Sequence, residues 1–139
     1  MRIQNIHIDE ELSDSEALCY TCEVMDGSKV FGVSYFSARH VPEAELESQI
    51  RRLTRALLRR LPRIIMELEN DISMLAREYG YPEPTEWTMD DFSDPDSRVY
   101  FSSDHTTRLS LVVSKIGCLD LIIDLDADFN VTDEPYLDG

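Results

Sequence analysis

The chain has 139 residues, of which 42% are hydrophobic, and its formal net charge is −15. This size fits one domain with a single core, spanning residues 1–139, and the strong negative charge opposes direct binding to nucleic acid or to an anionic membrane. No apolar run approaches the roughly 20 residues of a membrane span, and the N-terminus lacks the charged-then-apolar layout of a signal peptide, so we expect a cytoplasmic protein.

The first third predicts strands. The opening stretch RIQNIHI (2–8) is assigned one strand, and two more follow around Asp26-Gly27, a strong two-residue hairpin signal. If Met25 faces Ser28 across that turn, the hairpin is amphipathic. Its polar face holds Thr21, Glu23, Gly32 and Ser34, and its apolar face holds Leu18, Tyr20, Cys22, Val24, Phe31, Val33 and Tyr35.

The centre of the chain predicts one long amphipathic helix. Apolar residues recur at steps of three and four from Pro42, which suits a first helical position, until Gly80 ends the run. Pro62 lacks a backbone donor, so it should kink the helix or split it near Leu61. The stripe that should pack on the sheet consists of Leu46, Ile50, Leu53, Leu57, Leu61, Ile64, Leu68, Ile72 and Leu75.

The last third returns to strands, over residues 98–101, 108–114 and 119–126, with a turn near Ile116-Gly117. Apolar and polar residues alternate in the last two, so one face should be buried and the other should contact water. The sequence therefore predicts an α+β fold of order βββ-α-βββ. We expect an antiparallel sheet of about five to six strands packed on one helix.

Six arginines lie between residues 51 and 63, with no acid among them. On a helical wheel they fall opposite the apolar stripe or at its margin. Glu47 and Glu67 stand at i,i+4 spacing from two of them, but four have no acid at helical spacing: Arg52, Arg55, Arg59 and Arg60. These four are solvated, bound within the chain or part of a partner face. We predict that Arg55 or Arg59 forms an ion pair with an acid of the loop 83–97.

No motif identifies a catalytic, metal or cofactor site. Cys19 and Cys22 have CxxC spacing, but a strand directs residues three apart to opposite faces, so we expect neither a metal nor a disulfide there. Asp124, Asp126 and Asp128 match the opening of a calcium loop, yet Phe129 stands where glycine is needed. We predict no cofactor. The absence of motifs weakens an enzymatic role without excluding it.

The negative charge is concentrated in residues 78–139, which carry fifteen acids and three bases, net −12. Such a field attracts basic protein surfaces, unless the acidity serves only solubility. The residues predicted to bind a partner are Trp87, Asp90, Asp91, Phe92, Asp94, Asp96, Asp124, Asp126 and Asp128. The aspartates should be exposed, and the two aromatic residues should serve as anchors.

We therefore expect a non-enzymatic module that occludes a basic surface on a partner protein. Bacterial immunity proteins and antitoxins, which neutralise nucleases or nucleic-acid-modifying toxins, work in this way. Two alternatives stay open: a small acidic secretion-type chaperone that holds an effector, and a phage-type mimic of nucleic-acid charge. The sequence leaves open whether the protein is a monomer or a homodimer.

Overall fold

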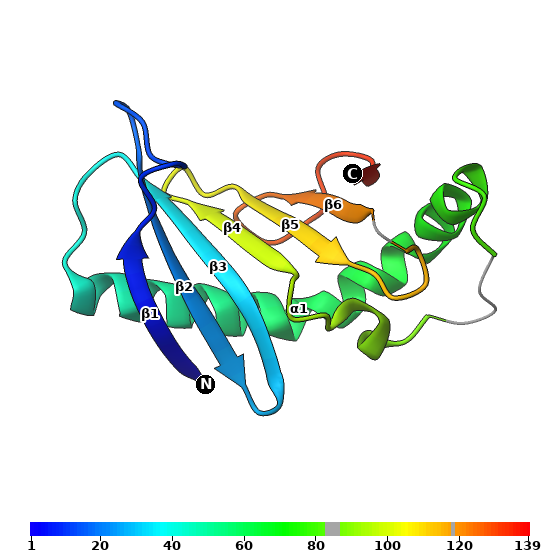
Figure 1. Ribbon diagram of the computed structural model, residues 1–139, viewed down its shortest axis with the longest axis horizontal. Helices are drawn as coiled ribbons and strands as arrows, with labels where there is room; N and C mark the ends of the chain where they lie inside the picture. The colour runs from blue at the N-terminus through cyan, green and yellow to red at the C-terminus, as the bar shows by residue number, and fades with distance from the viewer. Residues whose placement is uncertain (83–86, 118) are drawn as a thin grey trace.

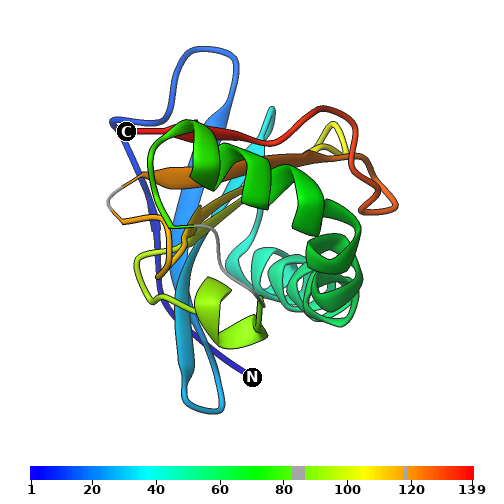
Figure 2. The ribbon, with the colours of Figure 1, turned by 90° about the vertical axis from the view of Figure 1, so that its right-hand side faces the viewer.

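The computed structural model describes residues 1–82, 87–117 and 119–139. They form a seven-stranded sheet with one long helix and one short 3-10 helix on the same side (Figures 1 and 2). The elements are β1 (Arg2–Ile8), β2 (Leu18–Asp26), β3 (Lys29–Ser37), α1 (Glu43–Glu78), η1 (Met89–Phe92), β4 (Arg98–Ser102), β5 (Thr107–Val112), β6 (Asp120–Leu125) and β7 (Tyr136–Asp138).

The order of the strands in the sheet follows the sequence from β1 to β7. Neighbouring strands are antiparallel except the central pair, because β3 and β4 run parallel. Parallel neighbours need a long crossover, and α1 supplies it. The α+β class and the single long helix are confirmed. The prediction of an entirely antiparallel sheet with five to six strands is wrong at this central pair and in the strand count, since β7 is too short to show alternation.

The β2–β3 hairpin turns at Gly27 and Ser28, and Asp26 pairs with Lys29. Only Gly27 of the two turn residues has a positive φ (63°), which is the pattern of a type II′ turn. The turn therefore lies one residue later in the sequence than predicted. As a result, each residue of β2 pairs with a residue of β3 two positions beyond its predicted partner. Because side chains alternate with a period of two, this shift leaves each side chain on its predicted face. The predicted apolar face is confirmed, since all its members belong to the core or pack against it.

Helix α1 runs without interruption from Glu43 to Glu78, with Pro62 inside it. Figure 2 shows the first half of the helix end-on and its second half crossing the view, so the helix changes direction along its length, and Pro62 lies near its middle. The predicted kink is confirmed, and no split occurs. At the C-terminus, Gly80 has a φ of 80°. The N–H groups of Gly80 and Tyr81 donate to the carbonyls of Arg77 and Ala76, a Schellman motif that ends the helix.

The core lies between the sheet and α1. The predicted stripe is buried at most positions, while Leu53, Leu61 and Leu75 are partly buried at its margin. Each buried leucine or isoleucine stabilises the fold by roughly 1.5–3 kcal/mol. Within the described residues, no helix has the length and apolarity required to cross a membrane.

The opposite face of the β2–β3 hairpin is polar, as predicted, yet several of its side chains are buried. Cys19, Thr21 and Ser34 are each at most 9% exposed, and the last two hydroxyls lie 3.4 Å apart. A Cβ atom at Gly32 would lie 2.8 Å from a guanidinium nitrogen of Arg98. The Arg98 side chain therefore lies across Gly32, and a larger residue at this position would require the guanidinium group to move.

Candidate partner-binding site

The segment 87–97 is fixed to the rest of the protein by its aromatic residues. Trp87 is half-buried and donates a hydrogen bond from Nε1 to Ser73 Oγ in α1 (2.9 Å). Its ring centroid lies 5.6 Å from that of Phe92 and 5.6 Å from the Lys115 ammonium. Phe92 is 3% exposed. Both predicted anchors are therefore held inside this chain, with Phe92 in its core.

Asp91 holds the same segment through its carboxylate. It accepts hydrogen bonds from the backbone N–H of Thr88 (2.9 Å) and from Ser114 Oγ (3.0 Å), and forms an ion pair with Lys115 (3.0 Å). Burial raises the pKa of Asp91, but these hydrogen bonds and the Lys115 charge outweigh it, so the pKa lies below its ordinary value. The expected exposure of Asp91 is wrong, because its side chain is 10% exposed.

One sequence signal pointed to this role. Thr88 and Asp91 stand at the spacing of a capping box, and they form one around η1. Nothing in the sequence pointed to Lys115 or Ser114, because their contact with Asp91 depends on where the end of β5 lies relative to η1.

The remaining acids of this segment face solvent to different degrees. Asp90 and Asp96 are exposed, as predicted, and Asp94 is partly exposed. Asp94 Oδ1 accepts the backbone N–H of Asp96 (2.8 Å), which orders the turn before β4.

Between this segment, α1 and the tip of the hairpin lies a cavity of about 230 Å³. Its exposed or partly exposed polar residues, Asp26, Lys29, Ser93 and Asp94, mark the mouth. Sequence patterns gave no indication of this cavity, because its walls come from separate elements. The other lining residues are Val30, Phe31, Leu57, Leu58, Leu61, Pro62, Met89, Phe92, Val99, Leu109 and Leu111.

Four of the clustered arginines have partners within the described chain. Two form the predicted helical ion pairs, Arg51 with Glu47 (3.1 Å) and Arg63 with Glu67 (3.1 Å). Arg60 donates to Asn130 Oδ1 (2.9 Å), which ties α1 to the loop after β6.

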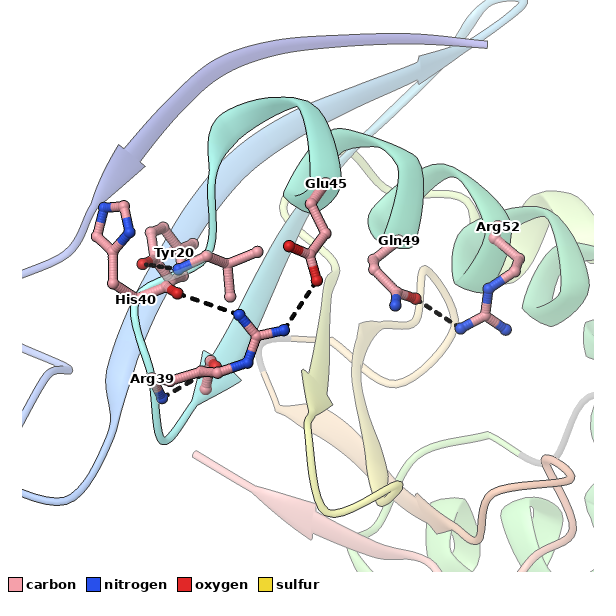
Figure 3. Close-up of polar contacts among 8 residues, drawn as sticks. Tyr20, Arg39, His40, Glu45, Gln49 and Arg52 are labelled. Atoms are coloured by element: carbon pink, nitrogen blue, oxygen red, sulfur yellow. Dashed lines mark hydrogen bonds and ion pairs between the residues drawn. The ribbon is translucent and has the colours of Figure 1, made fainter.

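The fourth, Arg52, donates to Gln49 Oε1 (2.6 Å). Figure 3 shows this contact beside the first turn of α1, where Arg39 binds Glu45 (2.8 Å).

Arg55 and Arg59 behave differently. Both are exposed, and within the described residues neither has a hydrogen bond or an ion pair. The predicted ion pair with loop 83–97 is therefore wrong for Asp90, Asp91, Asp94 and Asp96, and Glu83 and Glu86 lie outside the described residues. The reason is geometric, because both arginines line a separate open recess with Asp26 and Leu58.

The second predicted group of acids lies around the end of β6. Arg108 binds Asp124 through two contacts, Nε to Oδ1 (2.7 Å) and Nη2 to Oδ2 (3.1 Å), which raise the pKa of Arg108. Asp126 Oδ1 accepts the backbone N–H groups of Asp128 and Asn130, both at 2.9 Å. The hydrogen bond from Asn130 is the main cause of the lowered pKa of Asp126. Both acids are partly exposed, and Asp128 is exposed.

The two acidic groups do not form one site. Asp91 contacts Ser114, just past the end of β5, whereas Asp124 pairs with Arg108 near its start. At about 3.4 Å per residue, these positions are roughly 20 Å apart. Any partner that uses both groups must therefore span the sheet.

The cysteine pair follows strand alternation. Cys22 joins the core, and Cys19 is buried on the other face of the sheet, so the prediction that they point apart is confirmed. Burial, followed by the charge of Glu23, raises the pKa of Cys22 to about 12. In the part of the chain that the structure describes, no group of three or more His, Cys, Asp and Glu residues is placed to hold a metal ion.

Comparisons of the chain with known protein families, with curated proteins and with solved structures found no match.

Proposed function

We propose that the protein is a non-enzymatic module that binds a basic surface on a partner protein, as bacterial immunity proteins and antitoxins do. One observation carries this proposal: the acidity of residues 78–139 is largely uncompensated. Of the three bases there, Arg108 and Lys115 already bind acids of the same region. Asp90, Asp96 and Asp128 are exposed and have no basic partner within residues 1–82, 87–117 and 119–139.

The mechanism combines steering with occlusion. Exposed carboxylates raise the association rate with a cationic surface, and this benefit falls with ionic strength. Rim charges contribute little binding energy on their own, so a stable complex needs apolar burial near them. The cavity beside Asp94 offers such a place, because most of its lining is apolar.

The proposal can be tested with the tagged full-length chain as bait in the cells from which it comes. The test variant is Asp90→Lys/Asp96→Lys, and the matched control is Glu10→Lys/Glu11→Lys, which makes the same charge change at two exposed residues before β2. We expect a basic protein to be retrieved by the wild type and the control and largely lost with the test variant. Its association rate should be about tenfold lower with the test variant at low salt, with a smaller difference at 0.5 M salt. Equal retrieval by both variants would contradict the proposal.

A secretion-type chaperone is the second candidate, and the edge of the sheet favours it. Among the described strands β1 pairs only with β2, so its other side can accept an added strand from a client. Limited proteolysis of the retrieved complex separates the two candidates. A client held by a chaperone stays open to protease in the complex, whereas a folded toxin resists it.

A further inference from the structure

We propose that the cavity between the hairpin tip, α1 and η1 receives an apolar side chain of the partner protein, from a segment with an acid on one side and a base on the other. This inference rests on the proposed function, because it names the part of the partner that the site recognises. It depends on the lining of the cavity and on the unlike charges at its two sides.

The interior of the cavity is suited to an aliphatic or aromatic group. Three leucines of α1 line it, together with aromatic residues of β3 and η1, and the strands behind supply Val99, Leu109 and Leu111. Its volume of about 230 Å³ exceeds the roughly 150 Å³ of an engineered apolar cavity that stays dry and binds benzene. A side chain of the size of leucine, methionine or phenylalanine therefore fits, and its burial would tighten binding by roughly tenfold or more.

The side of the mouth formed by segment 87–97 is acidic. Asp94 stands at the mouth, and Asp90 and Asp96 are exposed in the same segment. The one described base that pairs with this segment is Lys115, and it binds Asp91 rather than these three. A lysine or arginine next to the inserted side chain would meet favourable charge here.

The other side of the mouth, formed by the hairpin tip and α1, is basic on balance, because it carries Lys29, Arg55 and Arg59 but only one acid among the lining residues, Asp26. The open recess that contains Arg55 and Arg59 adjoins the cavity, because Asp26 and Leu58 line both. Both arginines stand one helical turn apart without a partner in the described chain, and guanidinium groups in this arrangement suit a carboxylate. An acid on the partner segment would meet favourable charge here, whereas a second base would be repelled.

Short peptides test this geometry without knowledge of the partner. The probe is acetyl-Glu-Glu-Ala-Leu-Ala-Lys-Lys-amide, compared with versions that carry four lysines, four glutamates or alanine in place of leucine. Binding is followed by the methyl NMR signals of the full-length protein. We expect the mixed-charge peptide to shift the signals of Leu57, Leu58 and Leu61 and to bind about two- to fivefold more tightly than either single-charge peptide. The alanine version should bind at least tenfold more weakly.

Two variants identify the parts of the site. Leu58→Phe should fill the boundary of the cavity and abolish the leucine-dependent binding. Arg55→Gln/Arg59→Gln should remove the preference for the mixed-charge peptide over the four-lysine peptide. Arg52→Gln/Arg63→Gln, which removes equal charge elsewhere on α1, should leave that preference unchanged. Thermal unfolding confirms that each variant is folded, and indole binding to the wild-type cavity provides a measurement that depends on no charge.

The outcomes separate this inference from the proposed function. If Asp90→Lys/Asp96→Lys weakens partner binding but Leu58→Phe and Arg55→Gln/Arg59→Gln do not, the inference is overturned and the proposed function stands. If peptides and indole occupy the cavity but no basic protein is retrieved, the proposed function fails and the site stands. Absence of both peptide and indole binding at millimolar concentration overturns the inference.

Discussion

Two aspartate-rich stretches, residues 87–97 and 124–130, look alike in the sequence but differ in the structure. In the first, one carboxylate is turned inward, and Asp91 joins η1 to the end of β5. In the second, the carboxylates stay at the surface. Asp124 binds Arg108 on the sheet, and Asp126 closes its own loop.

The comparison shows that acidity alone does not assign a role to an aspartate. A carboxylate that accepts several hydrogen bonds while buried is structural, because removing it leaves donors without partners. A neighbouring exposed carboxylate contributes to the electrostatic field and little to stability. Both stretches hold exposed carboxylates without a basic partner among the described residues, and we expect the candidate site to consist of these, such as Asp90, Asp96 and Asp128.

The largest expected effect separates Asp91 from its neighbour. Asp91→Ala should lower the free energy of unfolding by about 2–3 kcal/mol, because the Thr88 and Ser114 donors and the partly exposed Lys115 charge lose their acceptor. Asp90→Ala should change it by less than about 0.5 kcal/mol. Urea denaturation of both variants measures the difference. Equal losses of unfolding free energy would show that Asp91 is no more structural than Asp90.

The Asp91 carboxylate should make the stability of the protein depend on pH in the acidic range. Its folded pKa is lowered, so the stability that it contributes is present above the unfolded value of about 3.9 and is lost as pH falls through the folded pKa. The difference in unfolding free energy between the wild type and Asp91→Asn should therefore be constant above about pH 5 and shrink below about pH 4. A difference that grows on acidification would show that the charged form is not the one stabilised.

Much of the fold could be predicted because it depends on local periodicity. The alternation in residues 18–35 identifies the buried face of the hairpin even though the predicted strand register was wrong. The three-and-four spacing after Pro42 identifies the buried face of α1 in the same way. The parallel pairing of β3 with β4 could not be predicted, because it depends on how α1 returns the chain to the sheet. No local pattern encodes that choice.

The site was less predictable than the fold. Exposure of Asp90 and Asp96 follows from their place in a turn-rich segment, but Asp91 is buried and contacts Ser114 and Lys115, which are distant in sequence. The cavity has the same origin, since its walls come from a hairpin, a helix and a 3-10 turn. Contacts between residues far apart in the chain determine both the burial of Asp91 and the formation of the cavity.

A smaller effect is expected at the second stretch. Asp124→Ala should lower the free energy of unfolding by about 1 kcal/mol, because the two-contact pair with Arg108 is partly exposed and therefore screened by water. The loss should shrink at 0.5 M salt, since the ion pair is weaker there. Thermal unfolding at two salt concentrations measures this. A loss of unfolding free energy as large as that of Asp91→Ala would mean that a surface carboxylate of the second stretch is as important for stability as the buried carboxylate of the first.

The smallest effect concerns the loop after β6. Asp126 accepts two backbone N–H groups but lies at the surface, where water can replace it, so Asp126→Ala should cost only about 0.5–1 kcal/mol. The change should instead appear as faster amide hydrogen exchange at Asp128 and Asn130, because these two donors lose their acceptor. Asp128→Ala is the matched control and should leave both exchange rates unchanged, since its own carboxylate closes no turn. If both substitutions speed exchange equally, the loop is not held by Asp126, and every aspartate of the second stretch except Asp124 belongs with the residues free to meet a partner.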